Sequence, residues 1–186
     1  MKPYLVGVDE VGRGCLFGPV IAAAVILDKY QNFELKDSKK LAEKKRILIS
    51  NQIQKNAKRV SIGEASVEEI DMLNIKEASL LAMKRAILGL KIENIEVLVD
   101  GTETPKINYP CKAIVKADDK IPEVMAASIV AKVFRDDLMI AFSKKYPDFS
   151  LEKNKGYPTK KHLNILKSLE PTKYHRMSFK PVLDAR

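Results

Sequence analysis

The sequence has few of the residues that build disulfides and soft metal sites. Its two cysteines, Cys15 and Cys111, lie far apart and have no metal-ligand spacing. We therefore expect no disulfide framework and a reducing, cytoplasmic compartment. The two histidines, His162 and His175, are too few for a site of several imidazoles or for a zinc site of Cys and His ligands. Any bound metal must then be held by carboxylates, which favour hard cations.

Long apolar runs, repeats and linkers are also missing. The longest apolar run, 20–27, is too short to span a bilayer, and the N-terminus lacks the apolar core and cleavage site of a signal peptide. The composition, 46% hydrophobic and 31% charged, is that of a globular protein. We expect one domain over residues 1–186, in which about 147–186 form a helical C-terminal extension, and no association with membranes.

The charge is strongly unbalanced. The chain has 33 Lys and Arg against 24 Asp and Glu, a formal net charge of +9. Such an excess favours an anionic partner, of which nucleic acid is the commonest. A soluble basic protein with no such partner would show the same excess, so charge alone does not decide between the two.

Short apolar runs with β-branched residues predict the strands of the fold. They lie at 4–8, 20–27, 60–62, 95–99 and 111–115. The first two flank a glycine-rich turn and are expected to be antiparallel. Helical patterns separate the later strands, which indicates a mixed α/β sheet with helical cover.

Apolar residues three and four apart predict the helices. One is expected over 41–54, one from Ser66 toward residue 90, and a long one that includes 126–134. Ser66 and Glu69 form a capping-box pattern at the start of the second helix. Thr159 is expected to cap a last helix, which runs to Glu170 before a proline.

Three of the apolar segments lead into an aspartate: Asp9, Asp100 and Asp118. Strands joined by crossover helices tend to be parallel, so their carboxyl ends gather at one edge of the sheet. Two like charges about 4 Å apart repel by about 4 kcal/mol at an effective dielectric of 20, so such a cluster calls for raised pKa values or bound cations. Phosphodiester chemistry with Mg²⁺ or Mn²⁺ is the function that this pattern favours. The alternative is that each aspartate only ends its strand.

Two further acids are less informative. Asp28 also ends an apolar run, but on an antiparallel strand, so we expect it at the opposite edge without a catalytic part. Glu10 follows Asp9, and adjacent strand residues face opposite sides, so it can join Asp9 only if the strand ends there.

Three segments have the composition of nucleic-acid contacts. Gly12-Arg13-Gly14 allows close backbone approach and offers a guanidinium to phosphate. Ser38, Lys39 and Lys40 begin a predicted helix, where Ser38 can cap the helix, contact phosphate together with the lysines, or do both. Tyr157 stands near Lys155 and suits stacking on a sugar or base, although a lone tyrosine more often packs in a core.

The order of these motifs resembles the ribonuclease HII family, the type 2 ribonucleases H. The matching blocks cover nearly the whole chain and are specific together. They comprise Asp9 to Gly14 with Gly18-Pro19-Val20, 37–41, 70–74 with 78–80, 99–101, 126–133 with Arg135-Asp136, 155–159 with His162, and 175–182. Phe17 departs from the pattern, because a small residue is usual there.

The resemblance implies an RNase H-like fold, with a five-stranded mixed sheet flanked by helices and a helical C-terminal part. It implies an endonuclease that acts on RNA/DNA hybrids and on ribonucleotide-containing duplex DNA, where it cuts 5′ of a single ribonucleotide. Apart from the resemblance, we expect a monomer. Two divalent ions, Mn²⁺ or Mg²⁺, would act there, and the products would carry a 3′-hydroxyl and a 5′-phosphate.

The resemblance also implies roles for residues. Asp9, Glu10, Asp100 and Asp118 match the catalytic, metal-binding acids, with Asp119 as the alternative to Asp118. Asp136 is expected to form a salt bridge. The turn Gly12-Arg13-Gly14 would sense the ribose 2′-hydroxyl, and Tyr157 would stack on the following deoxyribose.

Overall fold

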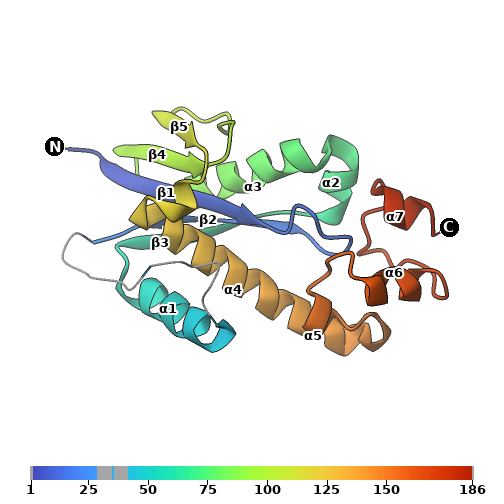
Figure 1. Ribbon diagram of the computed structural model, residues 1–186. Helices are drawn as coiled ribbons and strands as arrows, with labels where there is room; N and C mark the ends of the chain where they lie inside the picture. The colour runs from blue at the N-terminus through green and yellow to red at the C-terminus, as the bar shows by residue number, and fades with distance from the viewer. Residues whose placement is uncertain (1, 29–34, 36–41, 186) are drawn as a thin grey trace.

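The computed structural model describes residues 2–28, 35 and 42–185. Its centre is a five-stranded sheet with the strand order β3-β2-β1-β4-β5 (Figure 1). The strands are β1 (Tyr4–Val11), β2 (Val20–Ile26), β3 (Arg59–Ala65), β4 (Ile95–Asp100) and β5 (Cys111–Ile114). The pairs β1/β2 and β2/β3 are antiparallel, whereas β1/β4 and β4/β5 are parallel. The mixed sheet that the sequence predicts is confirmed.

Helices cover both faces of the sheet. One face packs against α2 (Val67–Leu73) and α3 (Ile75–Gly89), and the other against α1 (Glu43–Asn56) and α4 (Pro122–Lys145) (Figure 1). Strand β2 is buried throughout, because its alternate residues enter the two opposite cores. Gly7 of β1 allows α4 to lie directly on the strand, since a Cβ there would be 2.1 Å from the Glu123 carbonyl carbon.

Local sequence explains where the helices of the first face begin and end. Ser66 and Glu69 form the predicted capping box at the start of α2. Asn74 then adopts a φ of 72° and accepts hydrogen bonds from the Lys76 and Glu77 amides. The single helical region predicted from Ser66 is therefore two helices, because Asn74 ends one and caps the next.

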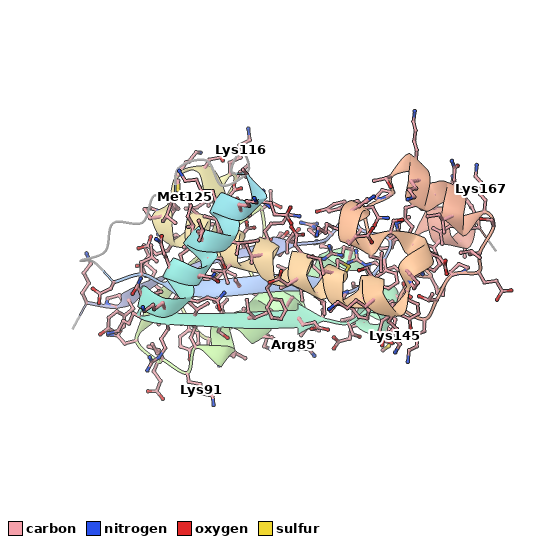
Figure 2. All side chains as sticks on the ribbon, turned by 90° about the horizontal axis from the view of Figure 1, so that it is seen from below. Arg85, Lys91, Lys116, Met125, Lys145 and Lys167 are labelled. Atoms are coloured by element: carbon pink, nitrogen blue, oxygen red, sulfur yellow. The ribbon has the colours of Figure 1, made fainter. Side chains whose placement is uncertain are left out.

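The C-terminal part packs beyond one end of the sheet, where the last turns of α4 extend (Figure 1). It contains α5 (Leu151–Asn154), α6 (Lys160–Leu166) and α7 (Lys180–Leu183). Thr159 caps α6 as predicted, but the helix ends at Leu166, because Lys167 and Ser168 turn to i→i−3 hydrogen bonds. In Figure 2, Lys167 of this part and Lys145 at the end of α4 lie far from Lys116 and Met125.

Phe17 organises the core of this C-terminal part. Its ring lies 4.9 Å from the His175 ring and 5.4 Å from the Phe142 ring, both edge to face. Phe17 is fully buried and also forms an isolated β-bridge with His175. The bulky residue at an unusual position is therefore accommodated by aromatic packing.

Among the described residues, no helix is long and apolar enough to cross a membrane.

Candidate active site

The carboxyl ends of two central strands bring Asp9 and Asp100 together. Strands β1 and β4 lie side by side and are parallel (Figure 1). Val8 pairs with Val99, so Asp9 and Asp100 follow at the same edge. Asp9 is 6% exposed, and Asp100 is the last residue of β4. The register of the sheet therefore places two acids from distant segments side by side.

Asp118 reaches the same edge from a turn. Strand β5 ends at Ile114, Lys116 is left-handed with a φ of 56°, and Asp118 lies in a 3₁₀ turn, η1 (Ala117–Asp119). The Ala117 amide donates a 2.8 Å hydrogen bond to Asp100 Oδ1, which ties this turn to β4. The sequence suggested that Asp118 ends a strand. In the structure it lies instead in the turn that follows β5. One carboxylate oxygen each from Asp9, Asp100 and Asp118 lies within 4.8 Å of the others.

Geometry separates the acids of the cluster from two acids nearby in the sequence. Asp118 is 3% exposed and belongs to the cluster, whereas its neighbour Asp119 is exposed. Asp28 follows β2 at the opposite end of β1, where it lines a separate pocket with Tyr4. The expectation that Asp28 lies away from the other acids is confirmed.

Glu10 borders the cluster beside the glycine-rich turn. Its Oε1 accepts a 3.1 Å hydrogen bond from Arg13 Nη1, while Oε2 is buried and has no hydrogen-bond partner among the described residues. Burial raises the pKa of Glu10, and Arg13 opposes this. The carboxylate therefore has one oxygen available for a ligand in the pocket.

The electrostatics of Asp9 reflect the crowding of charge. Burial, and after it the Glu10 carboxylate, raises the pKa of Asp9 well above its ordinary value. A hydrogen bond from Ser128 of α4 acts in the opposite direction. Carboxylates that are buried together in this way are stabilised in their charged form by a bound cation.

The acids line a pocket of about 340 Å³, and two basic side chains line it as well. Arg46 of α1 and Lys132 of α4 reach its rim, and both lie near Asp136: Lys132 Nζ at 2.7 Å and Arg46 Nη1 at 3.8 Å. The ion pair expected for Asp136 is confirmed. Sequence reasoning missed both cations; the only local signal is that Ser128, Lys132 and Asp136 are four residues apart on one helix.

The turn Gly12-Arg13-Gly14 follows directly after β1. Gly12 has a φ of +94°, a conformation that glycine adopts without strain. The Arg13 side chain is 52% exposed, and a Cβ at Gly14 would meet no atom within 4 Å. The turn therefore presents open backbone and a guanidinium next to the acids. Ser38, Lys39 and Lys40 lie outside the described residues.

Tyr157 lies at the pocket from the C-terminal side and is 37% exposed. Lys132 Nζ is 5.8 Å from its ring centroid, and its carbonyl contacts His162 Nδ1 at 3.0 Å. That carbonyl can only accept, so Nδ1 carries the proton and His162 Nε2 is an acceptor. His175 Nε2 then donates to His162 Nε2 over an N–N distance of 3.3 Å, while His175 Nδ1 accepts from the Thr172 amide. Two neutral, buried rings thus hold the Tyr157 backbone.

The family follows from sequence comparison. The family model for ribonuclease HII matches residues 6–182. The chain belongs to the ribonuclease HII family. Ribonuclease HII of Hydrogenovibrio crunogenus is 53% identical over 96% of this chain and 86% of its own length, and that of Shewanella halifaxensis is 51% identical over 98% and 90%.

A solved structure is similar to the whole fold. The crystal structure of ribonuclease H2 from Pyrococcus horikoshii has a TM-score of 0.85, with 24% identity over 97% of this chain and 96% of that one. The RNase H-like fold is thereby confirmed. Membership in the ribonuclease HII family makes the chain a ribonuclease H, an endonuclease that hydrolyses RNA in RNA/DNA hybrids.

Ribonucleases HII depend on divalent metal ions, and the residues of this chain fit such ions. Three carboxylates converge within 4.8 Å, and Glu10 Oε2 lies buried beside them without a hydrogen-bond partner in the described part of the chain. Oxygen ligands of this kind suit Mg²⁺ and Mn²⁺.

Proposed function

We propose that this ribonuclease HII cuts at the acidic pocket by two-metal catalysis, with Asp9, Glu10, Asp100 and Asp118 as its catalytic and metal-binding residues. The observation that carries this proposal is the convergence of three carboxylates at one edge of the sheet. Two divalent cations, Mg²⁺ or Mn²⁺, supply an activated water and neutralise charge on the leaving oxygen when they are bound. The products carry a 3′-hydroxyl and a 5′-phosphate.

The protein's own part is to hold these charges in place. Asp9 would help to hold both ions, and Asp100 and Asp118 would each help to hold one. The Ala117 amide fixes the orientation of Asp100, and Glu10, with one oxygen on Arg13, orients the attacking water. Because strand pairing positions Asp9 and Asp100, and the Ala117 hydrogen bond ties the Asp118 turn to β4, the side chains need little reorganisation during the reaction.

We extend the proposal to single ribonucleotides. Gly12, Arg13 and Gly14 border Glu10 and would contact the ribose 2′-hydroxyl, while the exposed ring of Tyr157 would stack on the next deoxyribose. Cleavage then falls on the 5′ side of a ribonucleotide embedded in duplex DNA.

Basic residues would hold the phosphate backbone of either duplex. Arg46 and Lys132 lie at the pocket, and Ser38, Lys39 and Lys40 are proposed to contact phosphates as well. Since every proposed group comes from one chain, a monomer suffices. The scarcity of cysteine supports the cytoplasm as its compartment.

A DNA duplex with one ribonucleotide tests the proposal. With Mg²⁺ or Mn²⁺, the enzyme should cut once, on the 5′ side of the ribonucleotide, and the fragment 3′ of the cut should carry a 5′-phosphate. An all-DNA duplex is the control and should stay intact. A protein that cuts a continuous hybrid but leaves the single ribonucleotide uncut would reject the specificity.

Replacing Asp100 by Asn separates catalysis from binding. The variant should lose activity on both substrates but still bind the duplex in a gel-shift assay, because removal of one negative charge does not weaken contacts to phosphate. A variant that cuts at the wild-type rate would overturn the role of the acidic pocket.

A further inference from the structure

Two buried arginines lie beneath the glycine-rich turn. Arg135 comes from the middle of α4, and Arg176 from the segment between α6 and α7. Both are 0% exposed and are among the largest fully buried side chains. A buried guanidinium is costly unless its donors find acceptors, so its partners indicate what it is for.

Arg135 joins two separate loops through three hydrogen bonds. Its Nε donates to the Pro19 carbonyl at 3.2 Å and its Nη2 to the Phe17 carbonyl at 2.9 Å, both in the loop after β1. Its Nη1 donates to the Lys155 carbonyl at 2.8 Å, two residues before Tyr157. One side chain therefore holds together two loops: the loop after β1, residues 12–19, called here the glycine-rich loop, and the loop that contains Lys155 and Tyr157, called here the Tyr157 loop.

Arg176 holds the same glycine-rich loop at other points. Its Nη1 donates to the Arg13 carbonyl at 2.9 Å and its Nε to the Gly18 carbonyl at 3.0 Å. Its own backbone amide donates to the Leu16 carbonyl at 2.8 Å. Burial lowers the pKa of Arg176 to about 10, which leaves it charged at neutral pH. The carbonyl of Arg13, at the centre of the turn, is thus fixed by a buried cation.

The packing leaves the turn little freedom to move. A Cβ at Gly12 would lie 2.2 Å from Arg135 Nε, so the guanidinium is in direct contact with the turn. The Leu16 amide also donates to the Gly156 carbonyl at 2.8 Å. The described hydrogen bonds of both guanidiniums go to main-chain carbonyls, and a planar fork of donors is needed to reach several at once.

We propose that Arg135 and Arg176 are positioning residues that lock the Gly12–Gly14 turn and Tyr157 into one relative arrangement, and that they thereby set the preference for a ribonucleotide followed by deoxyribose. They lie under the two loops and do not line the pocket of the acids. This inference rests on the proposed function, because it concerns the two groups that are proposed to sense the junction.

The test compares two substrates for Arg135→Lys and Arg176→Lys. Lysine keeps the charge but lacks the fork of donors. We expect kcat/KM on a duplex with one ribonucleotide to fall at least about tenfold more than kcat/KM on a continuous RNA/DNA hybrid. Gly12→Ala should have the same effect, because its methyl group displaces the turn from Arg135. Circular dichroism and thermal unfolding establish that each variant is folded.

Ile87→Ala is the matched control for lost stability. Ile87 is 1% exposed and packs between α3 and the sheet, away from both loops. This variant should unfold at a lower temperature but keep the wild-type ratio of the two rates. The inference is wrong if folded arginine and Gly12 variants keep that ratio, or if Ile87→Ala changes it equally. Failure of the wild type to cut the single ribonucleotide would instead reject the proposed function, and the inference with it.

Discussion

The acidic edge of the sheet and the C-terminal part differ in charge and in what holds them in place. Residues 1–143, which include the acidic edge, contain 22 basic and 20 acidic residues, whereas 144–186, the end of α4 together with the C-terminal part, contain 11 basic and 4 acidic ones. Most of the net charge of +9 therefore belongs to the last quarter of the chain. Figure 2 labels two of these basic residues, Lys145 at the end of α4 and Lys167.

The means of positioning differ as well. Asp9 and Asp100 are placed by backbone pairing between β1 and β4, which continues through the core. Tyr157 is placed by side chains: the buried His162–His175 pair and Arg135 hold the backbone around it. The sheet backbone thus positions the catalytic acids, whereas the proposed recognition of the substrate depends on side chains, two of which are histidines that can titrate. Changes in the first region should affect kcat, and changes in the second should affect selectivity and pH dependence.

The largest effect is expected at the acidic edge. Asp118→Asn should lower kcat with Mg²⁺ at least about 10³-fold, or about 4 kcal/mol, because it removes a proposed metal ligand. Asp119→Asn is the matched control: it removes the same charge one residue away, from an exposed position, and should stay within about twofold of the wild type. Initial rates on a continuous hybrid measure both. Equal losses would show that the position of the carboxylate is unimportant.

Much of this edge could be predicted from the sequence. Asp9 and Asp100 follow clear apolar strands, and helical patterns before the second predict a parallel crossover, so their meeting follows from local pattern and topology. The path to Asp118 could not be predicted, because it depends on a left-handed Lys116 and on the tertiary hydrogen bond from Ala117 to Asp100.

Residues on helices were harder to place. Arg46 and Lys132 reach the pocket only because α1 and α4 are rotated about their own axes so that these side chains face it. No local sequence pattern specifies that rotation. The same uncertainty affects Phe134, the last residue of the 126–134 segment whose apolar spacing predicts α4: its side chain is 42% exposed. The division of the chain into one domain with an extension over 147–186 stays a prediction.

The second effect is a pH dependence that begins in the C-terminal part. Burial lowers the pKa of His175 to about 4. Between about pH 6.5 and 4, the unfolded chain therefore binds a proton at this residue and the folded chain does not. Stability should therefore fall as the pH drops through 6.5, and this contribution should level off below pH 4. Between pH 7.5 and 5 the loss from His175 is about 2 kcal/mol. Urea unfolding at several pH values measures it.

A His175→Gln variant isolates that contribution from the titration of carboxylates elsewhere. It should be less stable at neutral pH, because the hydrogen bonds of the ring are lost, yet its stability should change less between pH 7.5 and 5. Parallel curves for the variant and the wild type would assign the pH dependence to other groups and remove His175 from the comparison.

The smallest effect concerns Tyr157 and separates recognition from catalysis most sharply. Tyr157→Ala should slow cleavage at a single ribonucleotide about tenfold, the cost of one lost stacking contact, and should affect a continuous hybrid less. Tyr157→Phe keeps the ring and should retain most of the rate, although it loses the contact between the hydroxyl and Cys15. Comparing kcat/KM on both substrates separates stacking from packing. If alanine slowed both substrates equally, the ring would support the pocket and would not distinguish ribose from deoxyribose, and the division of labour between the two regions would fail at this residue.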